Sequence, residues 1–249
     1  MKYKICVAIP IKSDDPNANT QLVETALEKS PDLIEFRFDY IKDIKLITIP
    51  FLKDLLKITP SNILKIFTFR SYHEGGKLNL KTDDHLRVLK LLVEGKPDYI
   101  DIEINLKLEN LNQIINLAYE NEVRLILSYH NFDRTISYKE VTALLNNFNN
   151  KLMHDLLIGL DKVYGCVYKI ILTAQHFDDN VIALNICKKL SQQEIKFVCF
   201  AMSDLGVLSR ILCVNFGSLW TYGSLVEKTA PGQIKIEKIR EIHQLLFEN

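Results

Sequence analysis

The stretch GCVYKIILTA, residues 165–174, places a lysine in the middle of an apolar run. Valine, isoleucine and tyrosine favour extended structure, so residues 168–174 are predicted to form a buried strand that contains Lys169. Lysine is rarely fully buried without a partner. Either this strand is an edge strand with one wet face, or Lys169 lies in a cavity where its amine is used.

Short apolar runs alternate with longer amphipathic segments along the whole chain. The predicted strands are residues 4–11, 32–40, 64–70, 99–104, 124–130, 168–174, 196–202 and 218–223. The predicted helices are residues 19–29, 50–58, 83–94, 108–120, 138–148, 178–190, 207–213 and 236–247. Strict alternation favours parallel β-α units with right-handed crossovers.

Eight such units are the number that closes a (β/α)8 barrel. We therefore expect an α/β fold, with residues 1–249 forming a single-domain (β/α)8 TIM barrel. The alternative is an open doubly wound sheet, but no Gly-x-Gly-x-x-Gly motif follows the first strand. The connection over residues 146–165 is longer than a simple link, and residues 151–159 could form an extra helix outside the barrel.

Composition and charge favour a small-molecule substrate. Lys plus Arg and Asp plus Glu number 31 each, so no nucleic-acid partner is indicated. No apolar stretch is long enough to span a membrane, and the start of the chain is interpreted as a strand and not as a signal peptide. The five cysteines are odd in number and widely spaced, as expected of reduced thiols in a cytoplasmic protein. No histidine spacing suggests a metal site.

Charged side chains recur near the predicted strand ends, where the chemistry of a barrel gathers. Glu35, Arg37 and Asp39 alternate along the second strand and so share one face. Asp101 and Glu103 do the same on the fourth strand. A solvated edge strand would alternate in the same way, but parallel strands are usually covered on both faces.

Further polar residues follow the third, fifth, seventh and eighth strands. His130 lies at the end of the fifth strand, where a general base is useful. Glu74, on a loop with two glycines after Arg70, could contact that base or a substrate hydroxyl.

Arg210 follows Met202 and could bind a carboxylate bidentately. Thr229 and Gln233 flank a Pro-Gly loop and could donate hydrogen bonds from a closing lid. Taken singly, each also fits a structural role, such as a surface turn, a helix-surface arginine or a structural histidine.

Lys169 shares a strand face with Ile171 and Thr173. Burial in an apolar pocket depresses a lysine pKa, and the neutral amine can attack a ketone or aldehyde to form an iminium. The alternative is an inward lysine paired with Asp101 or Glu103. The convergence of lysine, histidine, carboxylates and arginines on one barrel mouth favours catalysis.

Together these motifs resemble type I 3-dehydroquinate dehydratase, the Schiff-base enzyme of the shikimate pathway and aromatic amino-acid biosynthesis. The matching pieces are Glu35-Phe-Arg37-x-Asp39, Arg70 with Glu74-Gly-Gly76, Asp101-Ile-Glu103, Ser128-Tyr-His-Asn131, Lys169-Ile, Met202 through Ser209-Arg210, Phe216-Gly-Ser218 and Ala230-Pro-Gly-Gln233. The resemblance implies a (β/α)8 barrel that dehydrates 3-dehydroquinate to 3-dehydroshikimate without metal or other cofactor. It also implies a possible homodimer.

The resemblance implies roles for individual residues. Lys169 would form the imine, His130 would be the general acid and base, and Glu74 would sit beside it. Arg210 would bind the substrate carboxylate, and Asp101 would orient His130. The remaining polar ligands of the substrate would be Glu35, Arg37, Arg70, Thr229 and Gln233, with Met202 and Tyr222 supporting the site.

The sequence departs from the family at three positions of the expected pocket. Thr229 stands where serine is frequent, Tyr222 where phenylalanine is frequent, and Phe200 where methionine is common. Two other functions remain open: another Schiff-base barrel such as a class I aldolase, and a non-catalytic barrel that serves as a scaffold.

Overall fold

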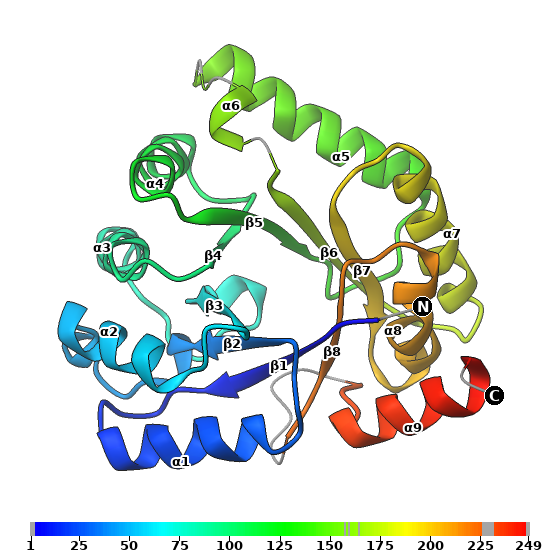
Figure 1. The fold of residues 1–249 in the computed structure, drawn as a ribbon. Helices are drawn as coiled ribbons and strands as arrows, with labels where there is room; N and C mark the ends of the chain where they lie inside the picture. The colour runs from blue at the N-terminus through cyan, green and yellow to red at the C-terminus, as the bar shows by residue number, and fades with distance from the viewer. Residues whose placement is uncertain (1–2, 157, 159, 164, 226–231, 248–249) are drawn as a thin grey trace.

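The computed structural model describes residues 3–156, 158, 160–163, 165–225 and 232–247. Eight parallel strands form a nearly closed barrel, and helices surround it (Figure 1). The strands are β1 (Ile5–Pro10), β2 (Leu33–Arg37), β3 (Leu64–Thr68), β4 (Tyr99–Glu103), β5 (Arg124–His130), β6 (Val167–Thr173), β7 (Phe197–Met202) and β8 (Thr221–Gly223). The predicted (β/α)8 barrel is therefore confirmed.

One helix follows each strand, and one short helix is added after β5. The helices are α1 (Pro16–Leu27), α2 (Ile49–Ile58), α3 (Thr82–Glu94), α4 (Leu108–Glu120), α5 (Tyr138–Asn150), α6 (Leu160–Val163), α7 (Asp179–Gln192), α8 (Val207–Leu212) and α9 (Ile236–Phe247). Local sequence begins several of them. Ser137 and Glu140 form a capping box at α5, and Asp15 caps α1 with Pro16 in its first turn.

The strand order answers the question of whether β6 is an edge strand. The hydrogen-bonded order is β7-β6-β5-β4-β3-β2-β1-β8, which places β6 between β5 and β7. The seam between β8 and β7 is linked just before β8, where Leu219 N donates to Phe197 O at 2.9 Å. Lys169 thus lies on an interior strand of a nearly closed sheet.

Several predicted strands are longer than the observed ones, and two of them differ by three residues or more. The strand expected over residues 32–40 ends at Arg37, because Phe38–Tyr40 turns into one turn of 3-10 helix that carries Asp39 off the sheet. The strand expected over residues 218–223 begins only at Thr221. The shortened β8 still pairs with β1, with Cys6 opposite Tyr222.

The predicted extra helix is partly right. Helix α5 runs two residues further than expected and continues as a π-helical turn, Lys151–Asp155, before α6 begins at Leu160. Figure 1 shows α5 and α6 on the outside of the barrel. The long connection therefore adds helical structure away from the barrel interior.

The strands alternate between two apolar environments. Ile34, Phe36, Ile100 and Ile102 pack outward in the cluster that also contains helix residues such as Leu89. The opposite faces fill the barrel, where the rings of Tyr99 and Trp220 lie 6.0 Å apart. Coverage on both faces is what makes any inward charge buried.

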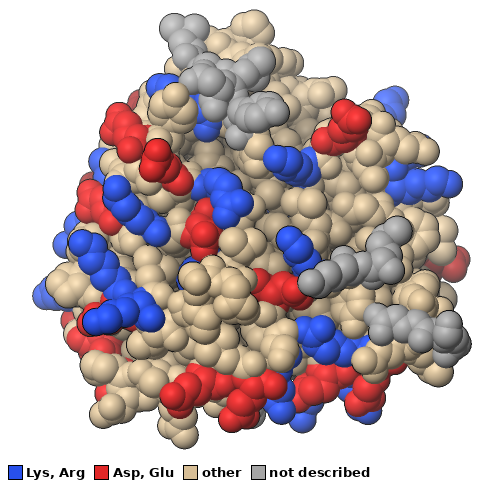
Figure 2. Space-filling model, in the orientation of Figure 1, with Lys and Arg blue, Asp and Glu red and all other residues tan. Residues whose placement is uncertain are grey.

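The described cysteines are all free thiols, and four of the five are buried. No described helix combines the length and the apolar composition needed to cross a bilayer. Lys and Arg side chains are interspersed with Asp and Glu over the face shown in Figure 2, in keeping with the zero net charge.

Two aspartates anchor neighbouring strands at their amino ends. Asp32 Oδ2 accepts a hydrogen bond from Ile5 N at 2.9 Å, and Asp98 Oδ2 accepts one from Lys65 N at 2.8 Å. Each carboxylate therefore accepts a hydrogen bond from a backbone N–H at the start of the neighbouring strand. Without the carboxylate, this N–H would have no protein acceptor.

We expect Asp98→Ala to lower the free energy of unfolding by about 1–3 kcal/mol, because it removes a charged acceptor from Lys65 N. Asp98→Asn keeps an acceptor oxygen and should lose less. Urea unfolding measures both variants. Equal losses for alanine and asparagine would contradict this role for the carboxylate.

Candidate active site

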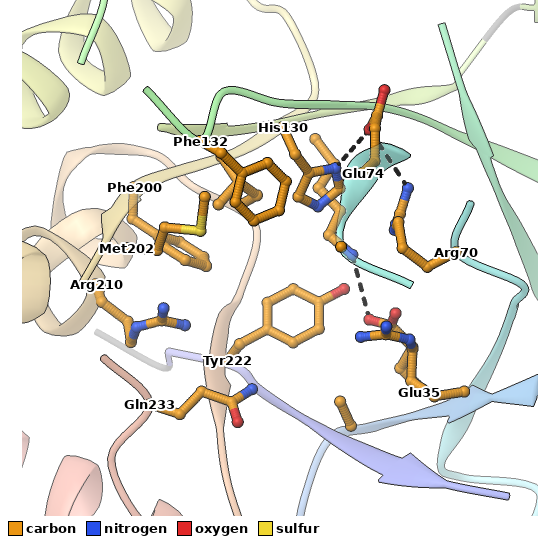
Figure 3. A pocket seen from close by; sticks show the side chains of 15 residues that line it. Glu35, Arg70, Glu74, His130, Phe132, Phe200, Met202, Arg210, Tyr222 and Gln233 are labelled. Carbon is orange, nitrogen blue, oxygen red and sulfur yellow. Dashed lines mark hydrogen bonds and ion pairs between the residues drawn. The ribbon is translucent and has the colours of Figure 1, made fainter. Parts of the chain in front are cut away.

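A single cavity at the carboxyl ends of the strands collects nearly all the predicted site residues (Figure 3). Its lining comes from seven of the eight strands or their following loops. The lining residues are Ala8, Glu35, Arg37, Arg70, Glu74, Gly75, His130, Phe132, Lys169, Ile171, Phe200, Met202, Arg210, Tyr222 and Gln233. Asp101 of β4 contacts Lys169 and Arg70 of this lining. Thr229 lies outside the described residues.

Lys169 is 5% exposed, and its amine is held between two carboxylates. Its Nζ lies 2.9 Å from Asp101 Oδ2 and 3.3 Å from Glu35 Oε2, and 4.6 Å from the centroid of the Tyr222 ring. The expectation of an apolar pocket is therefore wrong, and the pairing with Asp101 weighed as its alternative is present. These carboxylates are also the nearest proton acceptors for the amine.

Arg70 ties the carboxylates of β4 together. Its Nη2 donates to Asp101 Oδ1 at 2.8 Å, and its Nη1 donates to Glu103 Oε1 at 3.1 Å and to Ser128 Oγ at 2.8 Å. Burial opposes the charge of Arg70, but Asp101 and Glu103 outweigh it and raise the pKa of the guanidinium. Burial likewise opposes the charge of Asp101, but Arg70 and Lys169 lower its pKa. The buried charges thus maintain one another.

Glu74, and not Asp101, contacts the imidazole of His130. Glu74 Oε2 lies 2.9 Å from His130 Nδ1. Asp101 accepts hydrogen bonds from Lys169, Arg70 and Ser128, which departs from its expected role of orienting His130. The sequence had placed Glu74 beside the histidine, and the geometry makes that contact direct.

The surroundings of this pair shift both of its pKa values. Burial, followed by the charge of Glu103, raises the pKa of Glu74 to about 8, although Arg70 opposes the shift. Burial, with help from Arg70 and Lys169, lowers the pKa of His130 well below its usual value. Both shifts favour the uncharged pair, in which the carboxyl group and the imidazole share one exchangeable proton across their 2.9 Å contact.

The other side of the cavity carries a buried cation. Figure 3 shows Arg210 and Gln233 on one side, Glu35, Arg70 and Glu74 on the other, and Tyr222 between them. Arg210 is 1% exposed, with its guanidinium carbon 4.3 Å from the centroid of the Phe200 ring. Burial lowers the pKa of Arg210 to about 10, so it remains charged at neutral pH. An anionic group entering the cavity would stabilise this charge.

Asp39 positions Arg37 and does not line the cavity itself. The Nε and Nη2 atoms of Arg37 donate to the two carboxylate oxygens of Asp39 at 2.7 and 2.9 Å. This bidentate pairing outweighs burial and raises the pKa of Arg37. The 3-10 turn after β2 is what brings the carboxylate back to the guanidinium.

Sequence reasoning missed Phe132 and Gly75 in the lining. Phe132 is 44% exposed, and its ring stacks on that of His130 with 6.4 Å between centroids. Gly75 has φ +84°, and a Cβ there would lie 2.7 Å from the Phe132 ring. An aromatic residue two positions after the candidate base was the available signal for Phe132.

Within the described part of the chain, no group of three or more His, Cys, Asp or Glu side chains is arranged to hold a metal ion. The absence of a metal or other cofactor from the reaction stays a prediction.

We expect Arg70→Met to destabilise the protein by about 3–5 kcal/mol, because Asp101 and Glu103 would stay buried without their shared cation. Arg70→Lys keeps the charge but not the planar fork, and should lose less. Thermal unfolding at neutral pH measures the difference. A methionine variant as stable as the native protein would contradict the account of the network.

Comparison with known proteins gives one consistent family. A model of the family described as type I 3-dehydroquinase matches residues 5–249. The 3-dehydroquinate dehydratase of Thermococcus onnurineus (strain NA1) is 31% identical over 218 residues, which cover 88% of this chain and 89% of that protein. The 3-dehydroquinate dehydratase of Streptococcus mutans serotype c is 29% identical over 258 residues, covering 98% and 99%.

Solved structures give the same result. The crystal structure of type I 3-dehydroquinate dehydratase from Clostridium difficile, with covalently modified comenic acid, is similar at a TM-score of 0.81 and 27% identity. That match covers 100% of this chain and 93% of the other.

Proposed function

Since the chain belongs to the type I 3-dehydroquinase family, we propose that it dehydrates 3-dehydroquinate through an imine on Lys169, with His130 as the general acid and base. The chain is an enzyme of the shikimate pathway that acts on this small molecule. The proposal concerns how its own side chains carry out the reaction.

The observation that supports the mechanism is the placement of one buried amine and one imidazole on neighbouring strands. In the pairing of β5 with β6, Ser128 lies opposite Lys169 and His130 lies opposite Ile171. Lys169 and His130 both line the cavity, and the imidazole has its Nδ1 held by Glu74. A ketone between them would meet the amine on one side and the base on the other.

In the first step the Lys169 amine gives a proton to a neighbouring carboxylate, Asp101 or Glu35, and attacks the carbonyl carbon of the substrate. The carbon-nitrogen bond forms as the carbonyl π bond opens, and the oxygen takes one proton from the amine nitrogen. The carboxyl group returns the proton that it accepted, and the oxygen leaves as water. The resulting iminium places a positive charge next to the carbon that must lose a proton. This charge stabilises the electron pair left behind, which a free ketone does poorly.

In the second step the free Nε2 of His130 removes that proton. The electron pair then expels the hydroxyl on the next carbon, and the imidazolium protonates it as it leaves. General acid-base catalysis of this kind contributes about 10²–10⁴-fold. Hydrolysis of the conjugated imine releases the product and restores the Lys169 amine.

Polar groups on both sides of the cavity would hold the substrate ring. Arg210 would bind the carboxylate, and Glu35, Arg37 and Gln233 would bind hydroxyls. Arg70 donates its terminal nitrogens to Asp101, Glu103 and Ser128, so we assign it mainly to charge balance. Met202, Tyr222 and Phe132 would pack against the ring and exclude water. Thr229 stays a predicted ligand of the substrate.

We also infer a cytoplasmic location, which the free thiols of all five cysteines support. A homodimer stays a prediction that rests on the family resemblance, and light scattering on the purified protein tests it.

Borohydride tests the imine. With 3-dehydroquinate present, the native enzyme should be inactivated and its mass should increase by one reduced adduct located on Lys169. Lys169→Ala should lose nearly all turnover, followed as absorbance of the conjugated enone product, while still binding the substrate. His130→Ala should lose about 10²–10⁴-fold. A native enzyme that converts 3-dehydroquinate but forms no borohydride-reduced adduct would refute the imine.

The Glu74–His130 pair predicts the pH dependence. Because the pKa of Glu74 is raised to about 8, the pair holds a proton below that pH and frees the base above it. We therefore expect kcat/KM to rise with pH through about 8. In Glu74→Gln, which cannot ionise, the residual activity should lose this rise. A flat native profile between about pH 6 and 9 would contradict the assignment.

A further inference from the structure

The carboxyl group of Glu74 has a second contact, on the oxygen that does not face His130. Asn105, in the turn after β4, donates from Nδ2 to Glu74 Oε1 at 3.1 Å. The other oxygen, Oε2, lies 2.9 Å from His130 Nδ1. The two oxygens of one buried carboxyl group thus have different partners.

Asn105 reaches Glu74 from the side away from the substrate cavity. A second cavity is lined by Asn105, His85 and Glu103 together with Glu74 and His130. Glu74 and His130 line both cavities, whereas Asn105 lines only the second. The acid-base pair is therefore part of the wall between the two cavities, and the hydrogen bond from Asn105 reaches this pair at Glu74.

The chemistry of the contact decides where a proton can be. An amide NH2 group donates and does not accept, so Oε1 must be the acceptor in this hydrogen bond. When Glu74 is protonated, the proton is then on Oε2, between the carboxyl group and the imidazole. When Glu74 is ionised, its Oε2 accepts from Nδ1–H, and Nε2 of His130 is the free base.

The same contact also favours the ionised carboxylate. Burial, Glu103 and Asp101 oppose ionisation of Glu74, and Arg70 and Asn105 counter them. A hydrogen bond donated to a carboxylate is stronger than one donated to the neutral acid, so the amide stabilises the base-competent form of the pair.

Building on the proposed function, we propose that Asn105 is a positioning residue that keeps the proton of the Glu74–His130 pair on Oε2 and stabilises the ionised pair that acts as base. It does not line the substrate cavity, and among the described residues its side-chain hydrogen bond goes to Glu74 and not to the imidazole. Its effect is on how much of the enzyme has a free Nε2 at a given pH.

Two variants of similar size separate the effect of the hydrogen bond that Asn105 donates to Glu74 from the effect of its side-chain packing. Asn105→Leu offers neither a donor nor an acceptor, and Asn105→Asp offers only acceptors and a negative charge. We expect the rise of kcat/KM with pH to move to higher pH in the leucine variant and further in the aspartate variant. Below pH 8 the leucine variant should lose about two- to ten-fold, the range of one hydrogen bond. At high pH all three enzymes should converge.

Asn110 provides the matched control, because it lines the same second cavity without a hydrogen bond to Glu74 among those found. Asn110→Leu should keep the native pH profile. An Asn105→Leu variant with the native profile, or one that loses activity equally at every pH, would overturn the proposal. If the leucine variant does not fold, the aspartate variant decides by the same criterion.

Borohydride trapping distinguishes this proposal from the mechanism that it builds on. If the native enzyme traps the imine and the Asn105 variants keep its pH profile, only the role of Asn105 fails. If the native enzyme turns over without trapping, the imine mechanism itself fails.

Discussion

The carboxylate of Asp101 is the interaction on which the centre of the molecule depends. One of its oxygens accepts from Lys169 and the other from Arg70, so a single anion separates two cations inside a nearly closed barrel. Water cannot screen these charges well at full burial, so the network must balance itself. Parallel strands make this possible, because their carboxyl ends bring together Arg70 after β3, Asp101 of β4 and Lys169 of β6.

The sequence predicted the architecture because its strands and its helices have clearly different patterns of apolar residues. Strands covered on both faces are nearly continuous apolar runs, and amphipathic helices separate them, so inward charges such as Glu35 and Lys169 stand out. The partners of those charges could not be predicted. Whether Asp101 meets His130 or Lys169 depends on side-chain directions across the barrel. Asp39 and Phe132 belong to irregular turns, which periodicity does not describe.

Two aromatic residues that line the cavity, Tyr222 and Phe200, share a physical role. Lys169 Nζ lies over the ring of Tyr222, and the Arg210 guanidinium lies over the ring of Phe200. The two rings are 6.2 Å apart. Each aromatic face adds a cation-π contact to a buried cation. The pocket wall between Lys169 and Arg210 is thus aromatic.

The contact between Gly75 and Phe132 has a consequence for motion. The ring occupies the space in which a side chain on residue 75 would stand, so the turn carrying Glu74 and the strand end carrying His130 are interlocked. A displacement of the turn that contains Gly75 would therefore also displace the strand end next to Phe132. Glu74 and His130 would then move together, and the 2.9 Å distance between Glu74 Oε2 and His130 Nδ1 would be kept during small motions of the barrel mouth.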